Sequence, residues 1–324
     1  MDRRLWILVL LFASFPFLLP ACGGQSPPAL FRVALVVPGT LGDHGLWDGV
    51  YEGLKAAKET APIDLDVYQS QSEIPSQWEE QLTSASRSGR YDLIITGGRD
   101  RGHLFLPIAR QFPQQHYAYF GNPSALPNTA IFLFRTSEAT RAAGVLAGLM
   151  AQSLDPKGKQ SVAWFATRGV SSPESVAFEQ GLRSVDPHRP LEFIPVPEDP
   201  KESYSIAYAA FQQGVLIGAT DSSISSLGIL RAAAAADAYA IGYGEDQRDY
   251  YPGHVLGSII LKAPEVARSM VLQAKAGTLP FGDTVELGLE SSHVLLLLSP
   301  DLPPTVRRDL QEILHHPQGI ALAP

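Results

Sequence analysis

The sequence predicts an α/β fold made of two doubly wound, parallel-sheet lobes, and three observations support this prediction. Short apolar runs of strand length alternate with amphipathic segments of helix length along most of the chain. Such alternation is typical of parallel sheets that helices cover on both faces. The predicted strands are too many for one sheet of usual size, and 324 residues are enough for two cores.

The first half of the chain holds the first strand–helix series. Segment 31–39, FRVALVVPG, is nearly continuous in apolar residues and predicts a buried strand. Segment 45–61 places Leu46, Val50 and Leu54 on one face, so it predicts an amphipathic helix. The series continues with predicted strands at 63–70, 91–98, 116–122 and 129–136 and predicted helices at 72–89, 103–113 and 137–153.

The pattern starts afresh at segment 160–167, QSVAWFAT, which predicts the first strand of the second lobe. Segment 284–297, TVELGLESSHVLLL, predicts a last pair of strands. Between them lie predicted strands at 191–198, 215–221, 239–246 and 255–262 and predicted helices at 173–187, 202–214, 226–238 and 264–277.

Loops at the carboxyl ends of the predicted strands are the candidate ligand-binding segments. Ligands of open α/β sheets bind in the crevice outside these strand ends. If the two lobes face each other, the loops line one shared cleft. The loops concerned are 38–48, 96–102, 121–124, 167–173, 220–223 and 243–249.

The N-terminus has the features of a lipoprotein export signal. Two early arginines precede the apolar run Leu5–Leu19, which is shorter than the roughly 20 residues of a membrane-spanning helix. The sequence LPAC ends in Cys22 and resembles a bacterial lipobox, in which the cysteine is acylated; the alternative is a free cysteine after an ordinary signal. We predict a signal peptide over 1–21, acylation of Cys22, and a lipid-anchored flexible tether over 22–30.

Composition excludes several kinds of site. Cys22 is the only cysteine, so an intramolecular disulfide is impossible, and its position excludes thiol catalysis and cysteine-ligated metal in the mature chain. The formal net charge of −8, which becomes −9 when the signal is removed, argues against nucleic acid as a partner. G-x-S-x-G and HExxH motifs are absent, and GGRDRGH (97–103) lacks the ending of a phosphate loop. We therefore expect no enzymatic activity, no cofactor and no metal.

Four stretches, taken in order, carry a family resemblance. They are GDHGLWDGVYEGLKAA (42–57), YDLIITGG with ARQFPQQHYAYFGN (91–122), NTAIFLFRTSEATRAAGVLAGLMAQ (128–152), and YAIGYGEDQ with VLGSIILK (239–262). Together they resemble the basic membrane protein family, which includes purine nucleoside receptor lipoproteins and Med-like proteins. The resemblance implies a substrate-binding subunit of an ABC importer with a type I periplasmic-binding-protein fold.

That fold implies a three-segment hinge between the lobes. By analogy, lobe one comprises 31–136 plus 246–282, and lobe two comprises 137–245 plus 283–300. Residues 301–324 are left as a C-terminal helix and tail.

The resemblance also suggests residues that bind the ligand. In nucleoside-binding members, aromatic rings clamp the base and buried carboxylates accept hydrogen bonds from ribose hydroxyls, which are strong charge-assisted contacts. Asp43 aligns with the aspartate of the family's first loop, and Trp47 falls where the stacking aromatic residue lies. His44 lies beside them.

Two positions depart from the family pattern. Members usually end the YAYF strand with aspartate, whereas this chain has Gly121 and then Asn122. Members also have aspartate after the AIGY-type strand, where this chain has Gly244 followed by Glu245 and Asp246. If the missing carboxylates hold ribose in nucleoside receptors, Asn122, Glu245 or Asp246 must substitute for them, or the solute is a different small polar molecule.

Further candidates come from the remaining loops. Lys262 resembles a lysine often found after the last strand of lobe one, and its alternative role is a solvated strand end. Arg168 and Ser171 are predicted to face the cleft from lobe two. Gly98 belongs to a loop whose backbone N–H groups suit an anion, although Arg99 is expected to pair with Asp100. Asp221 is a candidate ligand group whose alternative role is to cap the next helix.

We therefore predict a lipid-anchored protein on the extracytoplasmic side of the cell membrane. It captures a small-molecule solute, such as a purine nucleoside, between two lobes and passes it to ABC permease and ATPase subunits. The first alternative is a ligand-sensing lipoprotein of the same fold without transport. The second is an α/β hydrolase, and the third is a binder that has lost its ligand.

Overall fold

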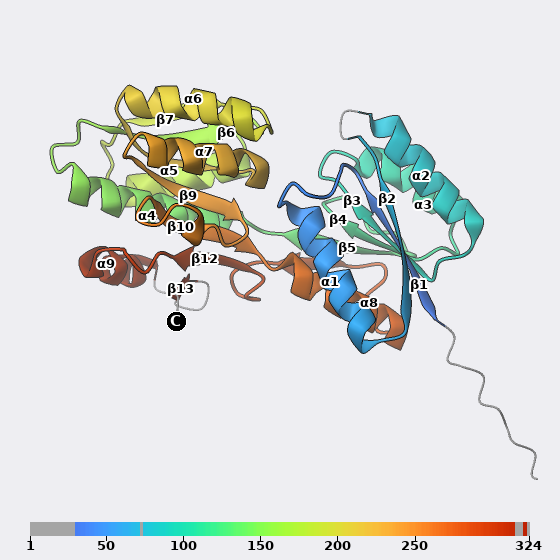
Figure 1. The fold of residues 1–324 in the computed structure, drawn as a ribbon. Coiled ribbons are helices and arrows are strands. Elements are labelled where there is room, and N and C mark those ends of the chain that lie inside the picture. Colours follow the sequence, from blue (N-terminus) through green and yellow to red (C-terminus); the bar gives the residue numbers. More distant parts are fainter. Residues whose placement is uncertain (1–29, 72–73, 315–319, 323–324) are drawn as a thin grey trace, which may run out of the picture.

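A computed structural model describes residues 30–71, 74–314 and 320–322 of the chain. They form two lobes, each built on one sheet that helices cover on both faces (Figure 1). The two-lobed α/β class predicted from the sequence is therefore confirmed. The predicted signal peptide and Cys22 lie outside the described residues.

The first lobe contains a six-stranded parallel sheet in the order β11-β5-β4-β3-β1-β2. Helices α1 and α8 pack on one face and α2 and α3 on the other, so each face has its own apolar core. The strands are β1 (Phe31–Val37), β2 (Ile63–Gln69), β3 (Leu93–Gly97), β4 (Tyr117–Phe120), β5 (Thr129–Phe134) and β11 (Thr284–Leu287). The helices are α1 (Leu46–Thr60), α2 (Pro75–Ser88), α3 (Gly102–Gln111) and α8 (Ala263–Ala276).

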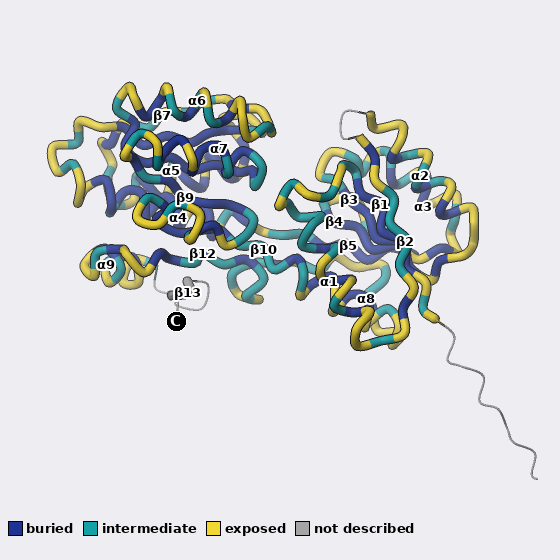
Figure 2. Tube along the Cα trace, in the orientation of Figure 1, coloured by how far each residue is buried: buried dark blue, intermediate teal, exposed yellow. Residues whose placement is uncertain are grey.

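The second lobe contains a seven-stranded sheet in the order β13-β12-β10-β9-β8-β6-β7, parallel except between β10 and β12. Helices α4, α5 and α9 share one core, and α6 and α7 share the other. Figure 2 shows the inner strands of both lobes as the buried interior, whereas the edge strand β2 is only partly buried. The strands are β6 (Ser161–Ala166), β7 (Leu191–Pro195), β8 (Val215–Thr220), β9 (Tyr239–Gly244), β10 (Val255–Leu261), β12 (Val294–Leu298) and β13 (Ile320–Leu322). The helices are α4 (Ser137–Leu154), α5 (Pro173–Val185), α6 (Pro200–Gln212), α7 (Ser223–Ala235), η1 (Arg248–Tyr250) and α9 (Pro304–Leu314).

Both sheets share one doubly wound strand order. The first lobe has β2-β1-β3-β4-β5, and the second has the equivalent β7-β6-β8-β9-β10. The order reverses between β1 and β3 and between β6 and β8. At such switch points, consecutive loops diverge and leave a crevice at the carboxyl ends of the strands. The fold therefore places the loops after these four strands where a ligand site is expected.

The chain crosses between the lobes three times, but not where the sequence-based division put two of the crossings. The crossings lie at 135–136, at Lys262 and at 288–293. Strand β10 was assigned to lobe one, yet it pairs with β9 in the second sheet. Strand β11 was assigned to lobe two and to a pair with β12, yet it pairs with β5 in the first sheet. Those two assignments are wrong because β10 stays in the sheet of the preceding strand, β9, whereas β11 returns to β5, which is distant in sequence.

Glycines allow the paired helices to touch backbone to backbone. In the α4–α5 pair, a Cβ added to Gly144 would lie 2.1 Å from the carbonyl oxygen of Phe178. A Cβ on Gly181 would lie 2.0 Å from the carbonyl oxygen of Arg141. Gly53 makes an equally close approach where α1 packs on α8. These positions accept no side chain unless the helices separate.

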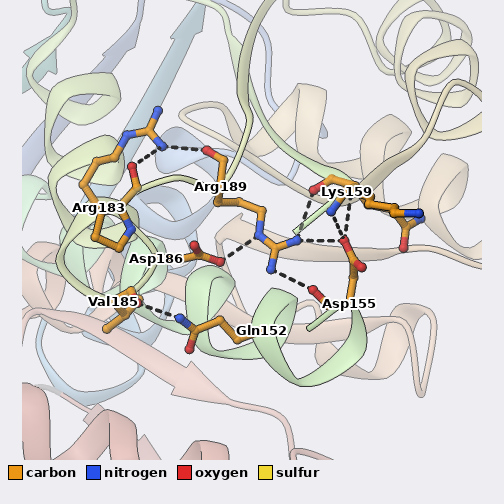
Figure 3. A network of polar contacts seen from close by, with 9 residues as sticks. Gln152, Asp155, Lys159, Arg183, Val185, Asp186 and Arg189 are labelled. Atoms are coloured by element: carbon orange, nitrogen blue, oxygen red, sulfur yellow. Dashed lines mark hydrogen bonds and ion pairs between the residues drawn. The ribbon is translucent and has the colours of Figure 1, made fainter. Parts of the chain in front are cut away.

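A buried arginine ties the ends of α4 and α5 together (Figure 3). Arg189 is 2% exposed, and its guanidinium donates to Asp186 Oδ2 at 2.8 Å and to Asp155 Oδ2 at 2.9 Å. It also reaches the carbonyl oxygens of Asp155 and Gln160. Amides of Gln160 and Lys159, together with this guanidinium, hold the pKa of Asp155 below its usual value. The buried charge is therefore paired, which a folded core requires.

Candidate functional site

A cleft of about 780 Å³ lies between the lobes, at the carboxyl ends of both sheets. Its volume is within the range of about 300–1,000 Å³ typical of small-molecule sites. The first lobe contributes the loops after β1, β3 and β4 and the end of β5, and the second contributes those after β6, β7, β8 and β9. The loops that were predicted from the strand ends therefore meet at this cleft.

The first lobe lines the cleft with aromatic rings. Trp47, from the first turn of α1, meets Phe120 edge to face with ring centroids 5.9 Å apart. Phe120 stacks in parallel with Phe134 at 6.1 Å. All three rings line the cleft. These rings offer flat apolar surface to a solute, beside the polar side chains of Asp43, Arg99, Asp100 and Asn122 from the same lobe.

The loop before α1 is held in place by its own carboxylates. Asp48 accepts from the amides of Gly42 at 2.7 Å and His44 at 2.6 Å, and Asp43 accepts from the amide of Gly45 at 2.8 Å. Burial raises the pKa of Asp43 above its usual value, and the neighbouring Asp48 adds to this. Asp43 lines the cleft with one oxygen already used by the loop.

His44 joins the two lobes at the rim of the cleft. Its Nδ1 lies 3.2 Å from Glu245 Oε1, which follows β9 in the second lobe. The same carboxylate oxygen accepts from the hydroxyl of Tyr250 at 2.6 Å. Neither His44 nor Glu245 is among the residues that line the cleft.

Glu174 is the centre of a charged wall on the second lobe. It lies in the first turn of α5 and is 3% exposed. Its Oε1 accepts from Arg99 of the first lobe at 3.2 Å and from Thr136 at 2.9 Å, and Arg168 lies 3.8 Å away. Burial alone would raise the pKa of Glu174, but Arg99, hydrogen bonds and Arg168 hold it below its usual value. Glu174 is therefore ionised at neutral pH and acts as an acceptor only.

Asp221 is a second buried carboxylate of this wall. It is fully buried, and its Oδ1 accepts from the amide of Thr167 at 3.0 Å and from the Thr167 hydroxyl at 2.7 Å. It does not cap α7, because Ser222 occupies the N-cap and accepts from the amide of Ser225. Arg168 lies close enough to interact with Asp221, Glu174 and the buried Tyr243.

The remaining predicted residues separate into two groups. Six of the predicted residues line the cleft, and their role in binding stays a prediction: Asp43, Trp47, Gly98, Asn122, Arg168 and Asp221. Five do not line it: His44, Ser171, Glu245, Asp246 and Lys262. The Asp246 carboxylate is engaged by Arg248 at 2.8 Å, and Lys262 precedes α8 at a lobe crossing.

Gly121 and Gly244, where the family resemblance implies aspartate, have no room for a side chain. Gly121 has φ +149°, and a Cβ there would lie 2.7 Å from Tyr119 Cε1. Gly244 has φ +100°, and a Cβ would lie 2.7 Å from the Cβ of Ser223. Both glycines line the cleft. Carboxylates at these positions would require local rearrangement.

Sequence reasoning missed Glu174, Tyr243 and Thr136 and misassigned Arg99. Arg99 pairs with Glu174 across the lobes and not with Asp100. Glu174 stands one residue beyond the predicted loop 167–173, so extending each loop by one helical turn finds it. Tyr243 opens the predicted loop 243–249, although it was not singled out there. Thr136 precedes α4 at a lobe crossing, and nothing in the local sequence marks it.

A sequence model of one family, described as ABC transporter substrate-binding protein PnrA-like, matches residues 30–318. The chain belongs to this family. The resemblance to basic membrane proteins is thereby confirmed, and the protein is a solute-binding component of an ABC transporter. Members of this family are generally not enzymes and act outside the cytoplasm. Membership implies a small-molecule solute and permease and ATPase partners.

Solved structures share the fold of this PnrA-like protein. A solute-binding protein of an ABC transporter from Aeropyrum pernix K1 has a TM-score of 0.75 at 22% identity, over 90% of this chain and 87% of that one. A transcriptional activator of the comK gene from Bacillus halodurans has a TM-score of 0.70 at 19% identity, over 89% and 97%. A carbohydrate-transporter solute-binding protein from Agrobacterium radiobacter, in complex with D-arabinose, has a TM-score of 0.66 at 13% identity, over 88% and 99%. The type I periplasmic-binding-protein fold is therefore confirmed.

Two further observations concern the described residues alone. None of their helices combines the length and the apolar character required to cross a bilayer. No group of three or more His, Cys, Asp or Glu side chains within residues 30–71, 74–314 and 320–322 is arranged to hold a metal ion.

Proposed function

We propose that this protein is a lipid-anchored receptor that captures a small polar solute, with a purine nucleoside as one candidate, between its lobes for import. The observation that carries the proposal is a cleft with an aromatic wall from one lobe and a charged wall from the other. A solute in that cleft touches both lobes at once. Its binding energy therefore favours the closed arrangement.

Contacts across the cleft support closure as the binding step. The Arg99–Glu174 and His44–Glu245 pairs each join one lobe to the other. They form together only when the lobes approach, whereas the three crossing segments remain connected throughout. In hinge motions of this kind, backbone torsion angles change at only a few connecting residues.

The direct test is to identify what the protein carries. We expect native mass spectrometry of protein purified without denaturation to find a small polar molecule that is released when the protein unfolds. The same molecule, added back to emptied protein, should reduce the radius of gyration measured by small-angle X-ray scattering. Release of a chemically altered molecule, or binding without compaction, would contradict capture by closure.

Lipid anchoring is tested at Cys22. The lipobox-like LPAC sequence leads us to expect that cells fed a labelled fatty acid will label the wild-type protein and leave Cys22→Ala unlabelled. The variant should also leave the membrane fraction, because the substitution removes the acylated thiol that holds the protein there. Equal labelling of the two proteins would show that another residue, or none, is acylated. Ser26→Ala, in the same tether, is the matched control.

A sensing role is the second candidate. The transcriptional activator from Bacillus halodurans shares the fold at 19% identity. The same fold is therefore found in a protein that is described as a regulator and not as a transport component. Transport and sensing differ in their partners. Stimulation of a co-reconstituted permease and ATPase by the loaded protein favours transport, whereas solute binding without any such stimulation favours sensing.

A further inference from the structure

The lining of the cleft between the lobes carries an excess of negative charge. Among the described residues, six carboxylates line the cleft and three guanidinium groups do so. The carboxylates belong to Asp43, Asp100, Glu138, Glu174, Glu198 and Asp221, and the guanidinium groups to Arg99, Arg135 and Arg168. A closed cleft with this lining has a negative potential, because its walls exclude the water that would screen the charges.

The arginines of the deep wall do not offset this excess, because their charges are already matched. Arg99 pairs with Glu174 at 3.2 Å. Arg168 lies 3.8 Å from the same carboxylate and is also attracted by Asp221 and Glu198. Two guanidinium groups therefore face three carboxylates on this wall. An anionic solute would have to compete with these carboxylates for either arginine.

The third arginine of the lining is outnumbered as well. Arg135 donates to Glu286 at 2.6 Å, and Glu138 and Glu290 also attract it. Glu286 and Glu290 lie outside the lining, so the charge of Arg135 is offset before the cleft carboxylates are considered. The negative excess of the cleft therefore persists at this lobe crossing.

Asp43 is the carboxylate of the lining that lies closest in the chain to an aromatic ring of the cleft, Trp47. It is half-buried, and one of its oxygens accepts from the amide of Gly45 at 2.8 Å. Burial and the neighbouring carboxylate of Asp48 both disfavour its charged form, and no cationic side chain of the described residues offsets them. A positive charge on a solute would do so.

The aromatic rings of the cleft are also suited to a cation. A positive charge within about 6 Å of the face of an aromatic ring is attracted by the electrons of the ring, most strongly by tryptophan. Cation–π contacts among the described residues lie on rings outside the lining, namely those of Tyr51, Trp78, Tyr91 and Tyr204. Arginines of this chain therefore leave Trp47 for the solute.

We propose that the solute is a small organic cation with a flat apolar body, and that Asp43 and Trp47 bind its positive charge. This inference rests on the proposed function and names the solute class of the same cleft. Asp100, Glu138 and Glu198 are exposed, so they attract the cation from solution and do not hold it. An uncharged solute would leave the excess charge unmatched on closure.

The experiment compares probes that share one ring system and differ in charge, by isothermal titration calorimetry on protein emptied of cargo. Tryptamine and phenethylamine are the cations, tryptophol and phenethyl alcohol are their uncharged counterparts, and indoleacetate is the anion. We expect at least one cation to bind more tightly than its counterpart by about tenfold or more, as one charged contact contributes. Added salt should weaken binding of the cation alone. The molecule recovered from native protein should itself carry a positive charge.

Variants identify the carboxylate that makes the contact. Asp43→Asn should weaken binding of the tighter cation by about tenfold or more and leave its uncharged counterpart within about twofold. Asn still accepts from the amide of Gly45, so the loop is retained and binding of the uncharged probe reports on folding. The matched control is Glu52→Gln, which removes a carboxylate of the same lobe that pairs with Lys55 outside the cleft.

Three results would overturn the inference. These are a recovered solute without a positive charge, an uncharged or anionic probe that binds as tightly as its cationic counterpart, and unchanged affinity for the cation in Asp43→Asn. Capture of an uncharged solute such as inosine, with compaction, would reject the cation and leave the proposed function intact. A protein that retains no molecule and binds no probe would contradict both.

Discussion

Replacing Gly181 with alanine is expected to lower the free energy of unfolding by about 2 kcal/mol or more, as overpacking at a rigid contact does. The added Cβ would lie 2.0 Å from the carbonyl oxygen of Arg141 and 2.9 Å from the amide nitrogen of Val145. Both atoms belong to the backbone of α4, which cannot move aside by rotating a side chain. The α4–α5 pair must therefore separate along its length.

The expected decrease in the free energy of unfolding is opposite in sign to the effect of helix propensity. Alanine is a better helix former than glycine by about 1 kcal/mol, so propensity alone predicts a more stable protein. Gln180→Ala is the control, because Gln180 is exposed on the same helix and changes propensity without a clash. Urea denaturation of both variants provides the comparison. A Gly181→Ala protein as stable as wild type would mean that the helices do not approach this closely.

Replacing Trp47 with alanine is expected to weaken binding of the recovered solute by about 10-fold to 100-fold, since stacking on an aromatic ring contributes about 1–3 kcal/mol. Trp47 lines the cleft and meets Phe120 edge to face, so its ring is positioned by the wall and not by the solute. Calorimetric titration of wild type and variant measures the loss.

Two further substitutions separate stacking from simple packing. Trp47→Phe keeps an aromatic face and should retain affinity within a few fold, whereas Trp47→Leu keeps apolar bulk and should lose most of it. Quenching of tryptophan fluorescence by the solute should also disappear with Trp47, because Trp78 and Trp164 are fully buried in the two cores. Equal binding by the Leu and Phe variants would reject the stacking role.

Much of the site's location was predictable from strand ends. Asp43, Gly98 and Asn122 follow predicted strands of the first lobe, and Arg168 and Asp221 follow strands of the second. All five line the cleft because parallel strands of a doubly wound sheet end at one edge. A place in a strand-end loop was not sufficient, because Ser171, Glu245 and Asp246 also lie in the predicted loops and do not line the cleft.

The partners within the site were not predictable. In the sequence, Glu174 is indistinguishable from any acidic residue in the first turn of a helix, where negative charge is common. Only closure brings Arg99 from the other lobe to it, which makes burial of the carboxylate possible. The same limit explains β10, whose apolar pattern is that of a buried strand in either sheet, and β11, whose four residues TVEL carry no such pattern.

The helices and strands, the two-lobed class, the loops that form the cleft and the family could all be predicted, because each depends on local periodicity or on short ordered motifs. The places where the chain crosses between lobes, the carboxylates buried in the cleft and the arginines that pair with them became known from the folded chain alone. Those features depend on contacts between residues far apart in the chain, for which no local pattern of apolar and charged residues carries a signal.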